Sequence, residues 1–193
     1  LVARQEFTEL ELGKLPMTEE ELIEVKPEFM GFHKGDYPGA FPPKVERKIR
    51  TIVSSPCLHL FSGSSTIGDV RVDLSHTNAT LNEDVYRYIT EDFENDNSWW
   101  KWVILDPVYN LENKHLQSKL RAYAKVESWS GNILYLRALE IFFQRHTENI
   151  LWFDTCSPQT PGFERHKVWF YIMGGYNAIR ALTWLKRKGE RLI

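Results

Sequence analysis

The stretch Cys57-Leu58-His59-Leu60-Phe61-Ser62-Gly63-Ser64-Ser65 changes abruptly from apolar to small residues. A short apolar run that ends in a cluster of small residues is typical of a buried strand followed by a tight loop. Four further segments have strand character, and they are Val70–Leu74, Lys101–Leu105, Ile150–Asp154 and Val168–Met173. Five such segments predict a sheet at the centre of the molecule.

Helical patterns separate these strands. Pro43 is suited to the first position of a helix, and Val45 and Ile49 lie on the apolar face of that helix. We expect further helices over residues 18–25, 80–89, 114–127, 132–146 and 178–188. The buried face of the helix over 80–89 is expected to consist of Leu81, Val85, Tyr88 and Ile89. Alternating strands and helices predict an open α/β sheet with helices on both faces.

The connection after the first strand is unusually short. Eight residues separate Phe61 from Val70, whereas a parallel crossover usually needs about a dozen or more. Either the crossover helix is missing, or the second strand is not a parallel neighbour of the first.

Composition limits the classes of protein that the chain can belong to. The 193 residues include 24 Lys and Arg against 26 Asp and Glu, and the net charge of −2 excludes a protein that is basic all over. No apolar run approaches the length of a membrane span, and no signal peptide is recognisable, so we expect a cytoplasmic protein without a membrane partner. The two cysteines, Cys57 and Cys156, have no metal-ligand spacing, so no metal is expected. Residues 1–42 are expected to form an irregular extension and residues 43–193 one domain.

Ligands of open α/β sheets bind at the carboxyl ends of the strands, which directs attention to the residues just past Phe61, Val72, Leu105 and Phe153. The loop from Phe61 to Gly68 lets a backbone approach a ligand closely, although it can also be an ordinary turn. It lacks the Gly-Lys-Ser/Thr ending of a phosphate loop. Asp73 ends the second strand, where a carboxylate can accept both hydroxyls of a ribose or can simply cap a turn.

The third strand ends in Asp106-Pro107-Val108-Tyr109. Proline has no N–H but keeps its carbonyl, so Asp106 and Pro107 offer two hydrogen-bond acceptors on adjacent residues. Two acceptors can hold one amino group, and Tyr109 can stack on the ring that carries it. The alternative is an Asp-Pro turn that only closes a strand.

Together these segments resemble a known family. The run from Val103 to Tyr109 resembles the Asp/Asn/Ser-Pro-Pro-aromatic motif of the methyltransferases that modify adenine N6 or cytosine N4 in DNA. Phe61-Ser62-Gly63-Ser64 is similar to their Phe-x-Gly-x-Gly loop, which holds S-adenosyl-L-methionine. Asp73 resembles their ribose-binding acid and Asp84 the acid near the cofactor adenine. Phe41 and Pro42, in the segment that begins at Tyr37, resemble a Phe-Pro segment at the methionine end of the cofactor.

The resemblance covers residues 37–110 and implies a Rossmann-like class I methyltransferase sheet, shortened after its first strand. It implies Asp106, Pro107 and Tyr109 as catalytic residues and S-adenosyl-L-methionine as cofactor. The chain departs from the pattern at three positions, with Val108 for the second proline, Ser65 for a glycine and His59-Leu60 for Asp-Pro. In addition, Asp73 follows Gly63 by only ten positions, a shorter interval than is usual in the family. A non-catalytic relative and a methyltransferase for RNA or protein therefore stay open as alternatives.

DNA is the expected partner. The candidates for phosphate contact are two basic clusters, one of Lys44, Arg47, Lys48 and Arg50, the other from Lys186 to Arg191. Each can also be a solvated helix face. A chain this short has little material for recognising a target sequence, so we expect a homodimer or a partner subunit to contribute.

Overall fold

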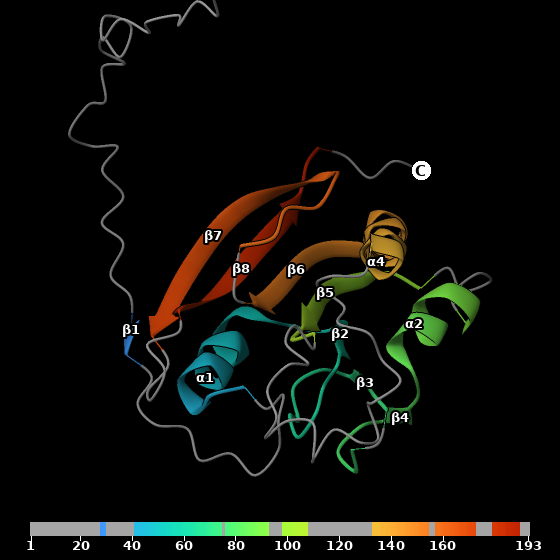
Figure 1. Cartoon of the computed structure of the whole chain (residues 1–193), viewed down its shortest axis with the longest axis horizontal. Helices are drawn as coiled ribbons and strands as arrows, with labels where there is room; N and C mark the ends of the chain where they lie inside the picture. Colours follow the sequence, from blue (N-terminus) through green and yellow to red (C-terminus); the bar gives the residue numbers. More distant parts are fainter. Residues whose placement is uncertain are drawn as a thin grey trace, which may run out of the picture.

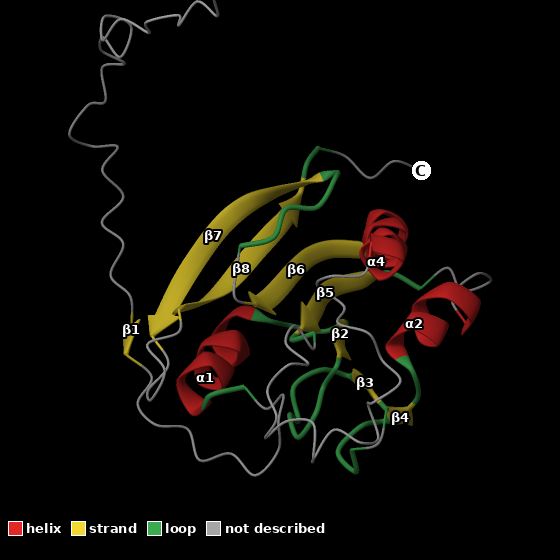
Figure 2. Ribbon diagram, viewed as in Figure 1, coloured by secondary structure: helices red, strands yellow, loops and turns green. Residues whose placement is uncertain are grey.

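The computed structural model describes residues 28–29, 41–74, 76–92, 98–107, 133–154, 157–172 and 179–189. The helices expected over 18–25 and 114–127 lie outside these residues. A single sheet runs through the described part (Figures 1 and 2), and its strands are β1 (Glu28–Phe29), β2 (Cys57–Leu60), β3 (Val70–Asp73), β4 (Leu81–Asn82), β5 (Trp100–Leu105), β6 (Thr147–Asp154), β7 (Phe163–Ile172) and β8 (Ile179–Arg187). The helical elements are α1 (Pro43–Ile52), α2 (Val85–Arg87), the π-helical turn η2 (Tyr88–Asp92) and α4 (Ile133–His146).

The strands follow the order β1-β7-β8-β6-β5-β2-β3-β4. All neighbours are parallel except β8, which is antiparallel to both β6 and β7. Without the two-residue strand β1, the seven remaining strands, numbered along the chain, have the order 3-2-1-4-5-7-6. The predicted α/β sheet is confirmed, and its order is consistent with a Rossmann-like methyltransferase core.

Side chains of the central strands alternate between two apolar layers. On one face, Val45 and Ile49 of α1 pack with Ile104, Leu151 and their neighbours. On the other face, the residues of α2, η2 and α4 pack with β2, β5 and β6, and the buried members include Leu58, Val103, Leu139, Phe143 and Ile150. Helices therefore cover both faces, as expected, and α1 lies on the face opposite α2 and α4 (Figure 2).

The short connection after β2 is a parallel crossover without a helix. Leu58 pairs with Val70 and Leu60 with Val72 in parallel register, so the first of the two alternatives is correct. The intervening residues 61–69 bend sharply, because Phe61, Gly63 and Gly68 have φ values of 58°, 50° and 103°. These left-handed conformations reverse the chain within the space of a loop.

The helix expected over residues 80–89 begins later than predicted. Leu81 is 41% exposed and belongs to β4, so its place on an inner helical face was wrong. The amide of Glu83 donates to the Asp73 carbonyl, which extends the strand pairing past β4. Val85, Tyr88 and Ile89 are buried, as predicted.

The helix expected over residues 178–188 was also wrong, because this segment forms β8. It lies between β6 and β7, and both neighbours pair with it. Its buried residues include both Leu182 and Leu185, which belong to opposite apolar layers of the sheet. Hydrogen bonds to two neighbouring strands outweigh local helix propensity, which is a weak preference.

Candidate functional site

The carboxyl ends of β2, β3, β5 and β6 lie at one edge of the sheet, because these strands are parallel. In the sheet, β3 and β4 lie on one side of β2, and β5 and β6, which come later in the chain, lie on the other side. The reversal makes the gap between β2 and β5 a topological switch point, where open α/β sheets bind their ligands. Leu60 is paired with Leu105, so the loop that begins at Phe61 and the residue Asp106 both begin at this point.

The loop after β2 is bonded to the end of β3. The Ser62 amide donates to the Val72 carbonyl at 3.0 Å, and the Gly63 amide donates to Oδ2 of Asp73 at 2.9 Å. Ser62 and Gly63 are buried, whereas Ser64 is partly exposed. The residues of the predicted cofactor loop thus form a compact turn beside Asp73.

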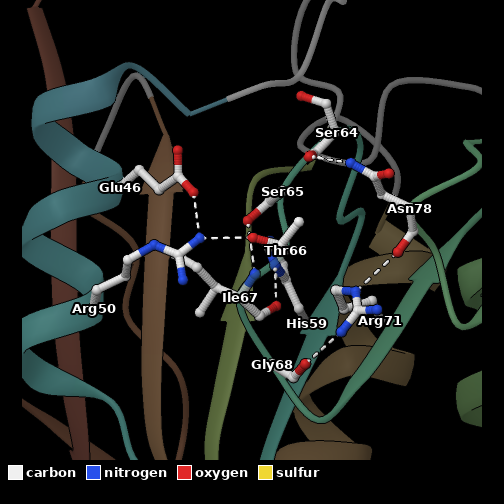
Figure 3. A network of polar contacts seen from close by, with 10 residues as sticks. All are labelled: Glu46, Arg50, His59, Ser64, Ser65, Thr66, Ile67, Gly68, Arg71 and Asn78. Carbon is white, nitrogen blue, oxygen red and sulfur yellow. Dashed lines mark hydrogen bonds and ion pairs between the residues drawn. The ribbon is translucent and has the colours of Figure 1, made fainter.

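A network of polar contacts fixes the rest of this loop (Figure 3). Arg71 donates to the carbonyls of Gly68 and Asn78, each at 2.8 Å, and the Asn78 side chain donates to the Ser64 carbonyl at 2.8 Å. From α1, Arg50 contacts the Thr66 hydroxyl at 2.7 Å while it is paired with Glu46. These contacts preorganise a segment that has no helix to support it.

Asp73 is buried, with 4% of its surface exposed. Besides the Gly63 amide on Oδ2, its Oδ1 accepts a hydrogen bond from the His76 amide at 3.0 Å. A carboxylate can accept about four hydrogen bonds, so these two amides alone do not exhaust its capacity. The turn-capping alternative is therefore realised, and it is compatible with ligand binding.

Asp84 follows β4 at the same edge of the sheet and is the N-cap of α2. Its Oδ1 accepts a hydrogen bond from the Arg87 amide at 3.1 Å. This contact accounts for an aspartate at this position, because Asp is among the preferred N-cap residues.

Phe41 and Pro42 lead into α1. The Phe41 ring stacks on His59 with centroids 5.3 Å apart and meets the edge of Phe153 at 5.8 Å. Pro42 is the N-cap residue of α1, and its carbonyl accepts the Glu46 amide. Both residues are buried on the α1 face of the sheet, while the segment from Tyr37 to residue 40 lies outside the described residues.

His59 is a buried neutral imidazole beneath Phe41. Its Nδ1 donates to the Ile67 carbonyl at 3.0 Å, which links β2 to the loop. Complete burial lowers the pKa of His59 to about 4. The chain therefore places an uncharged ring in β2 beside the loop.

Asp106 is 7% exposed and comes directly after β5. Burial raises the pKa of its carboxyl group to about 8; Arg180 opposes this increase and Asp154 adds to it. Pro107 is also buried. The third predicted catalytic residue, Tyr109, and its neighbour Val108 lie outside the described residues.

Sequence reasoning missed Asp154 and Arg180. Asp154 ends β6 at the carboxyl edge of the sheet, and this position was its only signal. Arg180 was hidden because its segment was assigned to a helix. Strand alternation places Arg180 on the same face as Leu182, and its guanidinium lies 5.7 Å from the centre of the Phe153 ring.

The two basic clusters lie in different parts of the fold. In β8, Lys186 pairs with Asn149 near the beginning of β6, so the second cluster lies at the edge opposite Asp106. Arg187 donates to the carbonyls of Phe143, Gln144 and Thr147 at the end of α4. In α1, Lys48 lies 5.2 Å from the ring centre of Trp169. Arg191 lies outside the described residues.

Comparisons with known proteins give no assignment. No family model matches the chain, and no curated protein matches it significantly. In the part of the chain that the structure describes, no group of three or more His, Cys, Asp or Glu side chains is arranged to hold a metal ion. Within the same residues, no helix combines the length and the apolar character needed to cross a membrane.

Proposed function

We propose that the chain transfers a methyl group from S-adenosyl-L-methionine to an exocyclic amine, adenine N6 or cytosine N4, in DNA. The observation that carries the proposal is that Asp106-Pro107 follows β5, the neighbour of β2, and that the loop after β2 is bonded to Asp73 through Gly63, at the switch point of a sheet with the order 3-2-1-4-5-7-6. The motif and the strand order support the proposal independently, since one depends on residue identity and the other on topology.

The residues of this edge fit the proposed cofactor. The small loop residues permit close approach, and the buried Asp73 carboxylate suits the two ribose hydroxyls. Phe41 provides an apolar wall next to the loop, as expected for a group that contacts the methionine end. When bound, S-adenosyl-L-methionine supplies an electrophilic methyl group on a sulfonium.

Asp106 and the Pro107 carbonyl would hold the amine. Each accepts one N–H, which orients the nitrogen lone pair and increases its nucleophilicity without a covalent enzyme intermediate. The carbonyl oxygen of a protonated carboxyl group can accept one N–H, and an ionised carboxylate accepts it more strongly, so ionised Asp106 is the better acceptor. Tyr109 is proposed to stack on the base.

The test is methyl transfer with labelled S-adenosyl-L-methionine to parallel DNA, RNA and protein substrates. With cofactor saturating, Asp106→Ala should lower turnover about 100-fold or more, as for removal of one preorganised polar contact, and should leave cofactor affinity nearly intact. Glu91→Gln, at an exposed position of η2, is the matched control. Wild-type turnover in Asp106→Ala would overturn the mechanism.

The same experiment separates the alternatives. Transfer to RNA or protein alone would replace DNA as the substrate. Cofactor binding without transfer to any substrate would favour a non-catalytic binding module, an alternative that Val108 and the shortened loop region support. A change of target activity with protein concentration would indicate that a second copy contributes to recognition.

A further inference from the structure

Two lysines from different elements lie at one indole ring. Nζ of Lys48, in α1, is 5.2 Å from the centre of the Trp169 ring, and Nζ of Lys167, in β7, is 5.4 Å from it. The ring attracts cations through its quadrupole, so it holds both ammonium groups although they repel each other. Trp169 is itself anchored, because it packs against the buried cluster on the α1 face of the sheet. The result is a local concentration of positive charge on a chain whose net charge is −2.

The basic residues of α1 divide between two sides of the helix. Arg50 donates to Glu46 and to the Thr66 hydroxyl, so its charge is used to fix the loop after β2 (Figure 3). Lys48 is two residues away, about 200° around the helix axis, on the side of β7 (Figure 1). The sequence pattern treats these residues as one cluster, whereas the fold separates a stabilising arginine from a lysine that meets another strand.

The two ammonium groups at Trp169 have no carboxylate to neutralise them. In the part of the chain that the structure describes, no salt bridge involves Lys48 or Lys167. The neighbouring strands β1 and β7 carry one carboxylate each, Glu28 and Glu164, and neither forms a salt bridge with these lysines. Lys167 is also exposed. Two uncompensated cations at one ring suit an anion with closely spaced charges, which is the character of a nucleic-acid backbone.

This surface lies level with the proposed methyl-transfer site. The register across β7, β8, β6 and β5 places Trp169 level with Asp106, the residue that follows Leu105. By strand alternation Asp106 is on the same face as Ile104, which shares the apolar layer against which Trp169 packs. Three steps between neighbouring strands, each about 4.8 Å, put the Trp169 backbone about 14 Å from Asp106. One turn of duplex DNA is about 34 Å, so a single stretch of DNA can reach both.

We propose that Lys48 and Lys167, held by Trp169, bind the phosphate backbone of the DNA substrate beside the methyl-transfer site. The choice of DNA rests on the proposed function, while the binding itself can be measured without any methyl transfer. Each ammonium group contacts phosphate as a point charge and releases condensed counterions, so this surface adds affinity and orients the DNA without selecting a sequence. Trp169 is a positioning residue that acts through the two lysines.

The test is the binding of a fluorescent DNA duplex of mixed sequence to the full chain, measured by anisotropy at several salt concentrations. The double variant Lys48→Gln/Lys167→Gln should reduce the slope of log affinity against log salt by about two units and weaken binding more than tenfold at about 0.1 M salt. Arg at both positions should retain the slope, because the charges stay. Lys101→Gln, at an exposed position near the start of β5, is the matched control and should leave the slope unchanged.

Trp169→Leu tests the role of the ring. It leaves both charges in place, so the slope should be retained, while affinity should fall about two- to fivefold through the loss of the cation–π contacts. Trp169→Phe keeps an aromatic ring and should recover part of this loss. Wild-type affinity in Trp169→Leu would overturn the positioning role.

The outcomes for this surface and for the proposed function are separable. An unchanged slope in the double Gln variant would overturn the inference, and so would an equal loss in the double Arg variant, because charge would not be the cause. Binding of an RNA duplex but not of DNA by the wild-type chain would overturn DNA as the occupant. A lysine-dependent slope in a chain that transfers no methyl group would establish this surface and overturn the proposed function, whereas methyl transfer with an unchanged slope would do the reverse.

Discussion

Gly63 and Asp73 are joined by a 2.9 Å hydrogen bond from the loop amide to the carboxylate, so the loop after β2 and the end of β3 form one structural unit. These are the two segments that the sequence resemblance assigns to cofactor binding. The bond also explains how a crossover without a helix stays ordered, because the buried carboxylate holds both Gly63 and His76.

Asp73→Asn should lower the free energy of unfolding by about 2 kcal/mol, because hydrogen bonds to a charged acceptor are lost at a buried site. Urea denaturation measures this loss. Asp84→Asn is the matched control, since Asn caps a helix about as well as Asp and the N-cap of α2 should be retained. Equal stability of Asp73→Asn and wild type would show that the carboxylate does not support the loop.

Gly68→Ala should destabilise the chain more than Gly189→Ala does. Both glycines have positive φ, 103° and 66°, which costs an L residue about 1–2 kcal/mol. At Gly68 a Cβ would also lie 3.1 Å from Cβ of His59 and 3.2 Å from the Val70 carbonyl, whereas at Gly189 it would meet nothing within 4 Å. Thermal unfolding of the two variants tests this order, and a smaller loss for Gly68→Ala would contradict the observed packing of the loop.

The strands at the centre of the sheet could be predicted because their burial requires a continuous apolar run. Trp102–Leu105 is such a run, and Cys57–Phe61 is one apart from the buried His59; polar or small residues follow each of them at the carboxyl edge of the sheet. The positions of Asp73 and Asp106 at this edge follow from the same pattern. The residues that neighbour them on other strands could not be predicted, since the sequence alone does not show which strands are adjacent.

The identity of β8 could not be predicted from local pattern. A segment with Ala181, Leu182 and Leu185 reads as an amphipathic helix, and only pairing with β6 and β7 makes it a strand. Because Arg180 is the second residue of this strand, the error also concealed its position next to Phe153 of β6. Leu81 was misplaced for a similar reason, since β4 forms only by pairing with β3.

The stability of the chain should decrease as pH rises from about 4 to about 8, through the contribution of Asp106. Its pKa is raised to about 8 in the folded protein, against about 3.9 in an unfolded chain. Between these two pH values the folded protein keeps a proton that the unfolded chain has released. Raising the pH therefore favours the unfolded chain and lowers the free energy of unfolding. Urea midpoints across this range should decline more steeply for wild type than for Asp106→Asn, which has no titrating carboxyl group. Parallel curves would mean that Asp106 is already ionised at low pH.

Arg187→Gln should destabilise the chain without changing the salt dependence of the proposed DNA binding. The guanidinium donates to the carbonyls of Phe143, Gln144 and Thr147 at 2.6–2.9 Å, at the negative end of the α4 dipole. Its loss should lower the free energy of unfolding by about 2–3 kcal/mol, whereas Lys186→Gln, at an exposed position of the same strand, should cost little.

Both residues lie at the edge opposite Asp106, so neither variant should alter the slope of log affinity against log salt. A slope reduced by about one unit in Lys186→Gln would instead place this end of β8 on the phosphate backbone and would require DNA to contact both edges of the sheet.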